Sequence, residues 1–377
     1  MTNIHVCLIS DQPIPNLIPL QMEKPGRAIF LVSEEKQNEA DRLRRIVQSW
    51  GIVIEEKKIP PFDLNAVAAT CAALIDEHGK DHLTLNVTGG TKISALAAFE
   101  AFYSGGCRII YVNTATDELM TLSPAEGKSI IPDLIGVRDY LASYGLRIEK
   151  GSGQPPTGLG QRVQQTKRLA ELFVKDEGLL QSINRKTQPL LNKDRHGLNY
   201  LHLEPGDFTG DNRAIFQLLR EAGIAAPGIN DGININRPED IFFLGGGWLE
   251  EFVYTTVRDL PVHDVMINVK VEWDGAGRKN TTNEFDVLFT HRNRLHVVSC
   301  KAANMEREST EGSKGKAAIY ELDALADKAG GLFGRTMLVS ARPLSDYDRS
   351  RSERMGIKIV AGRDLPQIKS FLQKWLK

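Results

Sequence analysis

Short apolar runs alternate with helical repeats of apolar positions through the first 145 residues. An alternation of this kind builds a parallel sheet whose two faces are covered by helices. Two intervening segments, 39–51 and 65–79, carry apolar residues at helical spacing, and each ends at a glycine. The pattern predicts a Rossmann-like α/β domain whose strands are 4–10, 28–33, 52–59, 83–88 and 108–114.

A stretch rich in Gly, Pro and polar residues, 151–161, follows this domain and has the composition of a linker. We therefore place the first domain at 1–150. Residues 151–240 are expected to form a connecting segment with helices at 164–178 and 212–223. The pattern does not define the fold of this segment.

Residues 241–377 return to a sharp alternation and are expected to form a second, smaller α/β domain. The expected helices are 247–260 and 316–330. The expected strands are 265–273, 283–290, 294–301 and 335–340.

The overall composition is that of an ordinary soluble protein, with a net charge of -1. No global basic field is available to attract a polyanion, so any contact with nucleic acid has to be local. Four widely separated cysteines without a C-x-x-C pair indicate reduced, buried thiols. With neither a signal peptide nor an apolar run of about 18 residues, we expect a cytoplasmic protein without membrane contact.

A Gly-Gly turn joins an apolar strand to a helix at Gly89, Gly90 and Thr91. Amide groups at a helix N-terminus attract anions, so this turn is a candidate phosphate site. It matches neither the Walker A loop nor the G-x-G-x-x-G fingerprint. Lys92 can face a phosphate as a point charge or be solvated, and a plain turn with Thr91 as N-cap is the alternative.

Polar residues also follow two other strands of the predicted sheet. Ser10 ends the first strand, Asp11 and Gln12 follow it, and Asn113 lies near the end of the fifth. Ligands of doubly wound sheets bind beyond the carboxyl ends of the strands, where all these residues are expected to lie.

The segments 10–16, SDQPIPN, and 86–92, NVTGGTK, together resemble the CARF domain, the CRISPR-associated Rossmann fold, in CARF–nuclease fusions of type III CRISPR systems. The resemblance implies a homodimer whose cleft binds a cyclic oligoadenylate, commonly cyclic tetra-adenylate. It also implies a set of ligand-binding residues, to which we add Asn113 as a further candidate: Ser10, Asp11, Gln12, Thr88, Gly89, Gly90, Thr91 and Lys92.

Two acidic residues stand two positions apart in the predicted strand 283–290. Strand alternation places Glu284 and Asp286 on one face, and Phe285 and Val287 on the other. Two carboxylates on one face repel each other unless a cation or solvent compensates.

The next predicted strand ends in the sequence HVVSCK. Alternation places Ser299 and Lys301 on one face and Cys300 on the opposite, apolar face. If the two strands pair through the short turn between them, their polar faces meet. Carboxylates that hold a divalent cation beside a lysine suit phosphodiester hydrolysis. The helix 247–260 adds Glu250 and Glu251, one of which can face the cluster.

These signals resemble the PD-(D/E)XK nuclease superfamily, and the resemblance implies a restriction-endonuclease-like fold for the second domain. The resemblance implies metal binding by Asp286, a catalytic role for Lys301 and an accessory role for Glu250. The chain departs from the pattern at Ser299, where the superfamily has Asp or Glu. We hypothesise that Glu284, Asp286 and the backbone carbonyl of Cys300 bind the metal, Mn²⁺ or Mg²⁺, while Ser299 acts through water or substrate.

Scattered basic residues follow Lys301 in a polar segment. Arg307, Lys314 and Lys316 can track a phosphate backbone, and a merely solvated loop is equally compatible with the sequence. The two resemblances together imply a metal-dependent endonuclease activated by cyclic oligoadenylate. They imply cleavage of single-stranded RNA, DNA or both, and are compatible with nicking of supercoiled DNA. The alternative is a cyclic-nucleotide sensor with an inactive nuclease fold.

Overall fold

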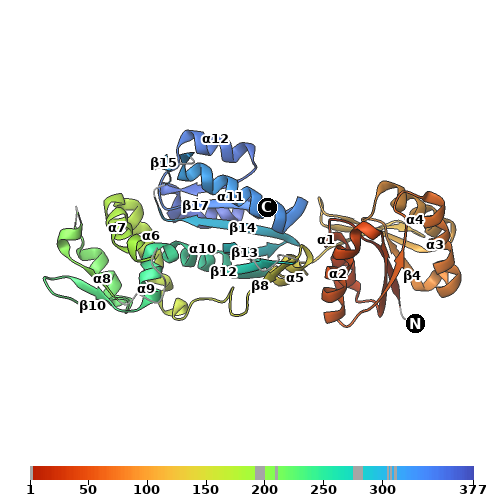
Figure 1. The fold of residues 1–377 in the computed structure, drawn as a ribbon, viewed down its shortest axis with the longest axis horizontal. Coiled ribbons are helices and arrows are strands. Elements are labelled where there is room, and N and C mark those ends of the chain that lie inside the picture. The colour runs from red at the N-terminus through yellow and green to blue at the C-terminus, as the bar shows by residue number, and fades with distance from the viewer. Residues whose placement is uncertain are drawn as a thin grey trace.

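A computed structural model describes residues 3–191, 200–208, 211–274, 283–303, 305, 308–309 and 312–377. Figure 1 shows two bodies side by side, with the N-terminal domain in red to orange and the remainder of the chain in yellow to blue.

The first body is built on a seven-stranded sheet in the order β3-β2-β1-β4-β5-β6-β7. The first five strands are parallel, and β6 and β7 are antiparallel additions that the sequence pattern did not predict. The five predicted strands are confirmed. The bounds are β1 Ile4–Leu8, β2 Arg27–Val32, β3 Val53–Lys58, β4 Leu83–Asn86, β5 Arg108–Asn113, β6 Glu118–Ser123 and β7 Gly127–Ile130.

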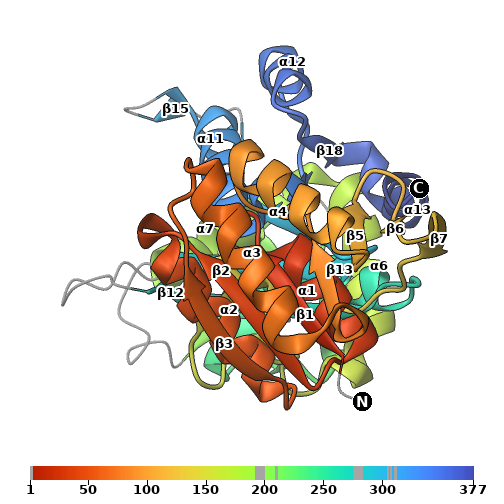
Figure 2. The same ribbon diagram turned by 90° about the vertical axis from the view of Figure 1, so that its right-hand side faces the viewer.

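Helices cover both faces of this sheet, as the alternation of the sequence requires. The helices are α1 Ile14–Glu23, α2 Gln37–Ser49, α3 Leu64–His78 and α4 Lys92–Ser104, with short helical turns η1 Glu34–Lys36 and η2 Lys80–His82. Helices α1 and α2 share a core with Phe30, whereas α3 and α4 share another with Leu31. Helices α1 and α2 lie on the side of the second body, and α3 and α4 lie on the far side, nearest the viewer in Figure 2.

The second body contains a six-stranded sheet in the order β18-β17-β14-β13-β12-β8. Its core strands form two antiparallel pairs, β12 with β13 and β13 with β14, followed by parallel β17 and β18. The bounds are β8 Leu146–Ile148, β12 Asp264–Trp273, β13 Asn283–His291, β14 Arg294–Lys301, β17 Arg335–Ser340 and β18 Lys358–Ala361, with a separate hairpin of β15 Glu308–Ser309 and β16 Gly312–Ser313.

The strand β8 precedes the boundary drawn at residue 150 yet pairs with β12 in the second sheet. Helix α5 Val137–Ser143, just before it, is buried against the second body: the Tyr140 hydroxyl donates to the carbonyl oxygen of Gly330 at 3.1 Å. The pattern of a three-residue strand carries no information about its distant partner, so the sequence assigned these residues to the first domain. The division into three segments itself stays a prediction.

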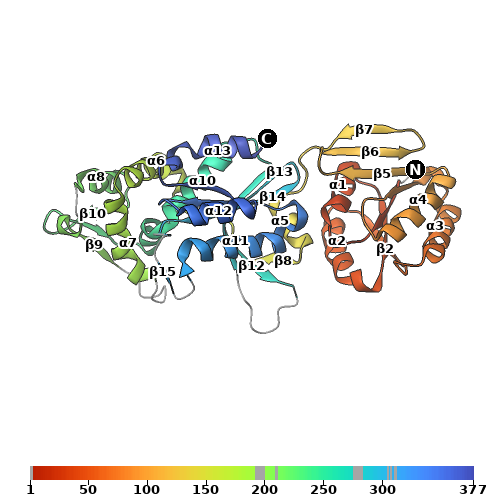
Figure 3. The same ribbon diagram turned by 90° about the horizontal axis from the view of Figure 1, so that it is seen from above.

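Helices also cover both faces of the second sheet (Figure 3). Helices α6 Leu159–Lys175, α10 Trp248–Arg258 and α13 Ile368–Trp375 share a core with Val287 and Val298. Helix α11 Lys314–Gly330 shares the opposite core with Leu288 and Val297. The remaining elements of the C-terminal part of the chain are α12 Asp346–Arg354, η6 Gly331–Phe333 and η7 Gly362–Gln367.

The predicted connecting segment is part of this second body. It forms α6, α7 Glu177–Leu191, β9 Leu201–Leu203, η4 Pro205–Asp207, α8 Arg213–Glu221, β10 Ala226–Pro227, β11 Ile233–Ile235, α9 Pro238–Phe242 and the π-helical turn η5 Phe243–Gly247. Its apolar residues belong to the same core as α10. Arg162 of α6 also forms a buried ion pair with Glu251 of α10, which ties the segment to the sheet-covering helix.

The four cysteines are buried and free, as the sequence predicted. Within the described ranges, none of the helices has the length and apolar character to cross a membrane.

Candidate functional site

The strands β13 and β14 separate at the point where Asp286 lies. The last pair of their ladder is Val287 with Val298, and Asp286, the residue that precedes Val287, has no partner in β14. The Asp286 carboxylate accepts hydrogen bonds from the amide of Cys300 at 2.6 Å and from the hydroxyl of Ser299 at 3.2 Å. The carboxylate therefore fills the gap between the diverging strands and joins the two sequence segments, as expected if their polar faces meet.

The prediction that Phe285 and Val287 share one face is wrong. Phe285 is buried in the core of α11, whereas Val287 is buried in the core of α10. Strand β12 changes face at the same level: Ile267 lies in the α10 core and Val269 in the α11 core. Asn268, between them, has a φ of 53°, so simple alternation fails there.

Three carboxylates and one lysine interact at this gap. Burial raises the pKa of Glu250 well above its ordinary value, Asp286 and Glu284 raise it further, and Lys301 opposes them. Burial also raises the pKa of Asp286, against Lys301 and the hydrogen bonds from Cys300 and Ser299. One Glu250 oxygen, Oε2, is buried without a hydrogen-bond partner among the described residues.

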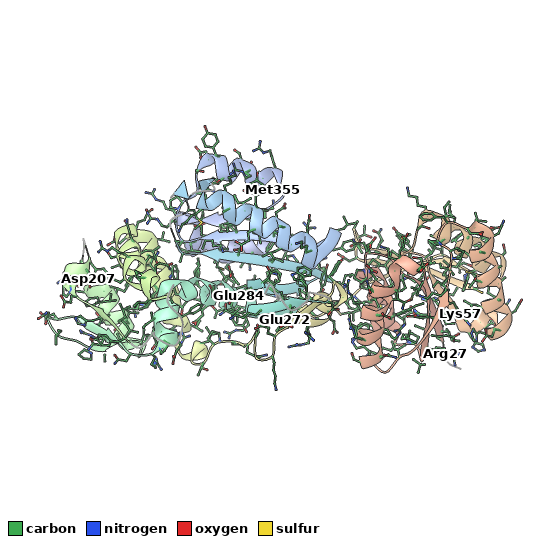
Figure 4. The ribbon with its side chains drawn as sticks, viewed as in Figure 1. Arg27, Lys57, Asp207, Glu272, Glu284 and Met355 are labelled. Carbon is green, nitrogen blue, oxygen red and sulfur yellow. The ribbon has the colours of Figure 1, made fainter. Side chains whose placement is uncertain are left out.

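Helix α10 presents Glu250 to this cluster and Glu251 elsewhere, since Glu251 is paired with Arg162. The turn η5 introduces the helix through Gly246, whose φ of 152° is open only to glycine. Cys300 points into the apolar core, where burial raises the pKa of its thiol. Figure 4 shows Glu284 within the second body, away from the first.

Lys301 ends β14 beside Ser340 of β17 and makes no ion pair with another described residue. A small cavity of about 30 Å³ is lined by Ser299, Lys301, Glu284 and also Glu321 of α11, a residue that the sequence analysis did not single out. In the described part of the chain, three His, Cys, Asp or Glu side chains nowhere lie close enough together to hold a metal ion by themselves.

Helix α7 supports the cluster from the segment predicted to be a connector. The Asn184 side chain donates to the carbonyl of Ala302 at 3.0 Å, directly after Lys301. Gln188 donates to the carbonyl of Gly245 in η5 at 3.2 Å. A polar residue on an amphipathic helix gives no signal of such a contact, so the sequence did not reveal either residue.

The Gly-Gly turn of the first body is packed against the end of β1. A Cβ atom on Gly89 would lie 2.2 Å from the carbonyl oxygen of Leu8, and one on Gly90, whose φ is +81°, would lie 2.7 Å from the Ser94 hydroxyl. Thr91 caps α4 by accepting from the amide of Ser94 at 3.1 Å. The close approach of the two loops therefore requires glycine at both positions.

Two buried asparagines that the sequence analysis missed hold these loops. Asn16 donates to the carbonyl of Leu8 at 2.9 Å, and Asn86 donates to Asn16 at 2.9 Å. Asn86 also accepts from the Thr88 hydroxyl at 2.7 Å, and Thr88 accepts from the amide of Val112 at 2.8 Å. Thr88 thus braces the strand ends.

The structure brings four of the predicted ligand-binding residues together around a cavity of about 100 Å³: Ser10, Asp11, Gly90 and Thr91. Lys36, which ends η1, and Phe62, in the turn between β3 and α3, also line it, and Lys36 pairs with Asp11 at 2.5 Å.

The other candidates lie around or away from this cavity. Gln12 accepts from the Tyr144 hydroxyl at 3.0 Å and so faces the second body. The Asn113 side chain accepts from the amide of Ala115 at 3.1 Å, and Lys92 is exposed at the start of α4.

Of the basic residues after Lys301, Lys314 and Lys316 begin α11, and Arg307 lies outside the described residues.

The fold and the two sites define a fusion of a Rossmann-like domain, with ligand loops at its strand ends, and an α/β domain with an acid–lysine cluster of nuclease type. Residues 4–140 match the family model of the Card1 CARF domain, and residues 238–377 match that of the Card1-like endonuclease domain. The chain therefore belongs to the CARF–endonuclease fusions of the Card1 type.

Solved structures agree with this assignment over the whole chain. Can2 from Sulfobacillus thermosulfidooxidans, in complex with cyclic tetra-adenylate, is 25% identical with a TM-score of 0.78, covering 100% of this chain and 99% of that one. Protein VC1899 from Vibrio cholerae is 25% identical with a TM-score of 0.87, covering 99% and 98%.

A type III CRISPR defence DNA nuclease activated by cyclic oligoadenylate shares the fold at 18% identity and a TM-score of 0.57, over 92% of this chain and 47% of that one. A search of curated proteins gave no match.

Proposed function

We propose that this protein is a metal-dependent endonuclease of the PD-(D/E)XK type, activated by cyclic tetra-adenylate in type III CRISPR defence. Its substrates are single-stranded RNA, single-stranded DNA or both, and it can nick supercoiled DNA. The observation that carries the proposal is the Asp286 carboxylate in the gap between β13 and β14, near Glu250 and near Lys301, which forms no ion pair with another described residue.

The residues at this gap fit a divalent cation. Asp286 and Glu284 raise the pKa of Glu250, and one oxygen of Glu250 has no hydrogen-bond partner among the described residues; a neighbouring positive charge stabilises such a group of acids. Glu284, Asp286 and the backbone carbonyl of Cys300 would hold it, with further oxygens from water or substrate. A bound Mn²⁺ or Mg²⁺ would supply Lewis-acid stabilisation of charge on the reacting phosphate.

The side chains around the proposed metal position have separate roles in catalysis. Lys301 stabilises negative charge that develops on the phosphate and helps position the nucleophile. Ser299 keeps Asp286 in place through its hydroxyl and can bond water or substrate. Glu250 acts as the accessory acid of α10.

The activator is proposed to bind at the loops of the first body. The amides of Gly89 and Gly90 donate to no acceptor within the described residues, so they are available to a phosphate. Ser10, Asp11 and Thr91 share the cavity beside this turn. The cyclic tetra-adenylate complex of Can2, whose chain aligns over its full length, supports this ligand.

A homodimer is proposed to assemble through the first body. Helix α4 exposes Ile93, Leu96 and Tyr103, with 63% of Leu96 and 59% of Tyr103 accessible. These positions form an apolar stripe directly after the Gly-Gly turn, and contiguous exposed apolar surface marks association sites. Two copies joined there bring two activator loops to one cleft.

Two routes of contact are proposed to couple the activator to the nuclease cluster. Gln12 of the activator loop bonds Tyr144, and the adjacent Tyr140 bonds Gly330 at the end of α11, the helix beside Ser299. The turn after Asn113 places Asp117 against Arg294, which begins the strand that ends at Lys301. Activation requires the ligand to favour the cutting arrangement over the inactive one.

The test is cleavage of labelled RNA and DNA with Mn²⁺ or Mg²⁺, with and without cyclic tetra-adenylate. We expect cleavage only when metal and activator are both present, and its loss in Asp286→Ala and Lys301→Ala.

A second function is favoured by Ser299 and by the lack of a three-ligand group in the described ranges. It is a sensor that binds the cyclic nucleotide without cutting. Tight binding of the activator without cleavage of any substrate would establish it and contradict the nuclease.

A further inference from the structure

A cavity of about 650 Å³ opens beside the nuclease cluster and reaches Glu284. Glu284 also lines the small cavity that Ser299 and Lys301 line, so this side chain borders both cavities. The larger cavity is enclosed by residues 149–154, by the ends of α7 and α9, and by β12. A nucleic-acid strand with a phosphate at the cluster can place a neighbouring nucleotide in this cavity, past Glu284.

The wall formed by residues 149–154 is held in place by hydrogen bonds to β12, although the composition of 151–161 predicted a linker. The amide of Glu149 donates to the carbonyl of Lys270 at 2.9 Å, and the Ser152 hydroxyl donates to the carbonyl of Asn268 at 3.0 Å. Gly153, at a φ of +77°, packs so tightly that a Cβ atom would lie 2.4 Å from the Met266 methyl carbon. The cavity is therefore part of the folded second body.

A lysine lies next to Glu284 in this cavity. Lys270 of β12 is the cross-strand partner of Glu284 of β13, and residues in this relation have neighbouring side chains. Neither Lys270 nor Lys150, the other lysine of the cavity, forms an ion pair with a described residue. Lys270 thus offers a free positive charge one strand away from the nuclease acids.

The remaining polar groups suit an uncharged base and sugar rather than a run of phosphates. Three carboxylates, Glu149, Glu239 and Glu284, outnumber the two lysines. Gln154 and Asn268 add amide donors and acceptors, and their side chains make no hydrogen bond with another described residue. Carboxylates accept from exocyclic amino groups and ribose hydroxyls, whereas the amides can bond base edges.

We propose that this cavity binds one unpaired nucleotide of the strand being cut, with its phosphate at Lys270 and its base at Gln154 and Asn268. The inference rests on the proposed nuclease function and assigns one nucleotide of its single-stranded substrate to this cavity. The volume is that of a small-ligand pocket, in the range of about 300 to 1,000 Å³. A base inside a duplex is stacked and paired and must be extruded to enter, so the cavity selects single strands.

The experiment measures binding separately from cutting. The full-length Lys301→Ala protein, saturated with cyclic tetra-adenylate, is titrated into fluorescein-labelled single-stranded and duplex oligonucleotides of equal length. Lys270→Gln removes the phosphate partner, and Gln154→Trp fills the cavity. Lys358→Gln, at the start of the edge strand β18, is the matched control for loss of one lysine. Melting curves establish that each variant is folded.

We expect Lys270→Gln to weaken single-strand binding about tenfold and to lower its salt dependence by about one counterion. Gln154→Trp should weaken single-strand binding without changing the salt dependence, and Lys358→Gln should change neither. If both cavity variants bind single strands as tightly as the Lys301→Ala parent does, or lose duplex binding to the same extent as single-strand binding, the inference is overturned.

The outcomes for the cavity and for the function are distinguishable. Wild-type protein that fails to cleave with metal and activator refutes the nuclease, while the binding titration still decides the role of the cavity. Wild-type protein that cleaves, with both cavity variants cutting single strands at the wild-type rate, refutes the cavity alone.

Discussion

Asp286 is expected to have two separable roles, as acceptor of a buried amide and as an acid of the nuclease cluster. Asp286→Asn keeps an oxygen that can accept from the amide of Cys300, whereas Asp286→Ala leaves that amide without a partner. An unsatisfied buried donor costs about 1 to 3 kcal/mol. In a body of this size each kcal/mol lowers the melting temperature by about 2 to 4 °C, so Asp286→Ala should melt about 2 to 12 °C lower.

Asp286→Asn should melt no lower than wild type, because it removes a charge that burial disfavours. Both variants should cut at least about 100-fold more slowly, since neither retains the charge of the carboxylate. Thermal melts with EDTA measure the first effect, and cleavage with Mn²⁺ and cyclic tetra-adenylate measures the second. Asp327→Asn, an exposed acid of α11, is the matched control.

Equal melting temperatures for the Asn and Ala variants would refute the reasoning about the Cys300 amide. Wild-type cleavage by Asp286→Asn would remove Asp286 from the nuclease site.

Three further predictions concern the folded state and the activator loop. Burial lowers the pKa of His296 to about 3 from 6.5, so below pH 6.5 the unfolded chain gains a proton that the folded one does not. As the pH falls from 6.5 to about 3, the free energy of unfolding should decrease by about 1.4 kcal/mol per pH unit. Urea unfolding of His296→Phe should lack this pH dependence, and equal slopes in the variant and the wild type would contradict the prediction. Arg162→Met should lower the free energy of unfolding by about 3 to 5 kcal/mol, because it leaves the buried Glu251 carboxylate without its partner. The double variant Arg162→Met/Glu251→Leu should recover most of this loss in the same urea assay. A single variant as stable as the wild type would argue against a role of the ion pair in stability. Gly89→Ala should weaken binding of cyclic tetra-adenylate at least about tenfold in calorimetry, because its Cβ collides with a backbone carbonyl, while Gly160→Ala, in open space, should bind normally; equal affinities would contradict a ligand role for the turn.

Much of the fold was predictable because its apolar positions repeat with regular periods. All five parallel strands of the first body and the main strands of the second lie where the pattern placed them. The strands β6, β7 and β8 were not predicted, since a short strand at or near the edge of a sheet carries little periodic signal. The middle segment escaped because its apolar residues complete a core formed with α10, which local patterns do not reveal.

The parts of the candidate site that are formed by residues close together in the sequence were predictable, and the parts formed by residues far apart in the sequence were not. Asp286, Ser299 and Lys301 lie on two adjacent strands joined by a short turn, so their meeting followed from the sequence. The orientation of Glu250, the support from Asn184 and the cavity behind Glu284 depend on helices and loops far away in the chain.

Local order along the chain therefore determined the two α/β sheets, the Gly-Gly turn and the acid–lysine pair, because each is set by residues close together in sequence. The tertiary structure alone decided which face each acid occupies, as the left-handed Asn268 shows by reversing the alternation of β12. It also turned Gln12 away from its loop and toward Tyr144. Such contacts arise from packing between bodies, and packing between distant segments leaves no periodic trace in the sequence.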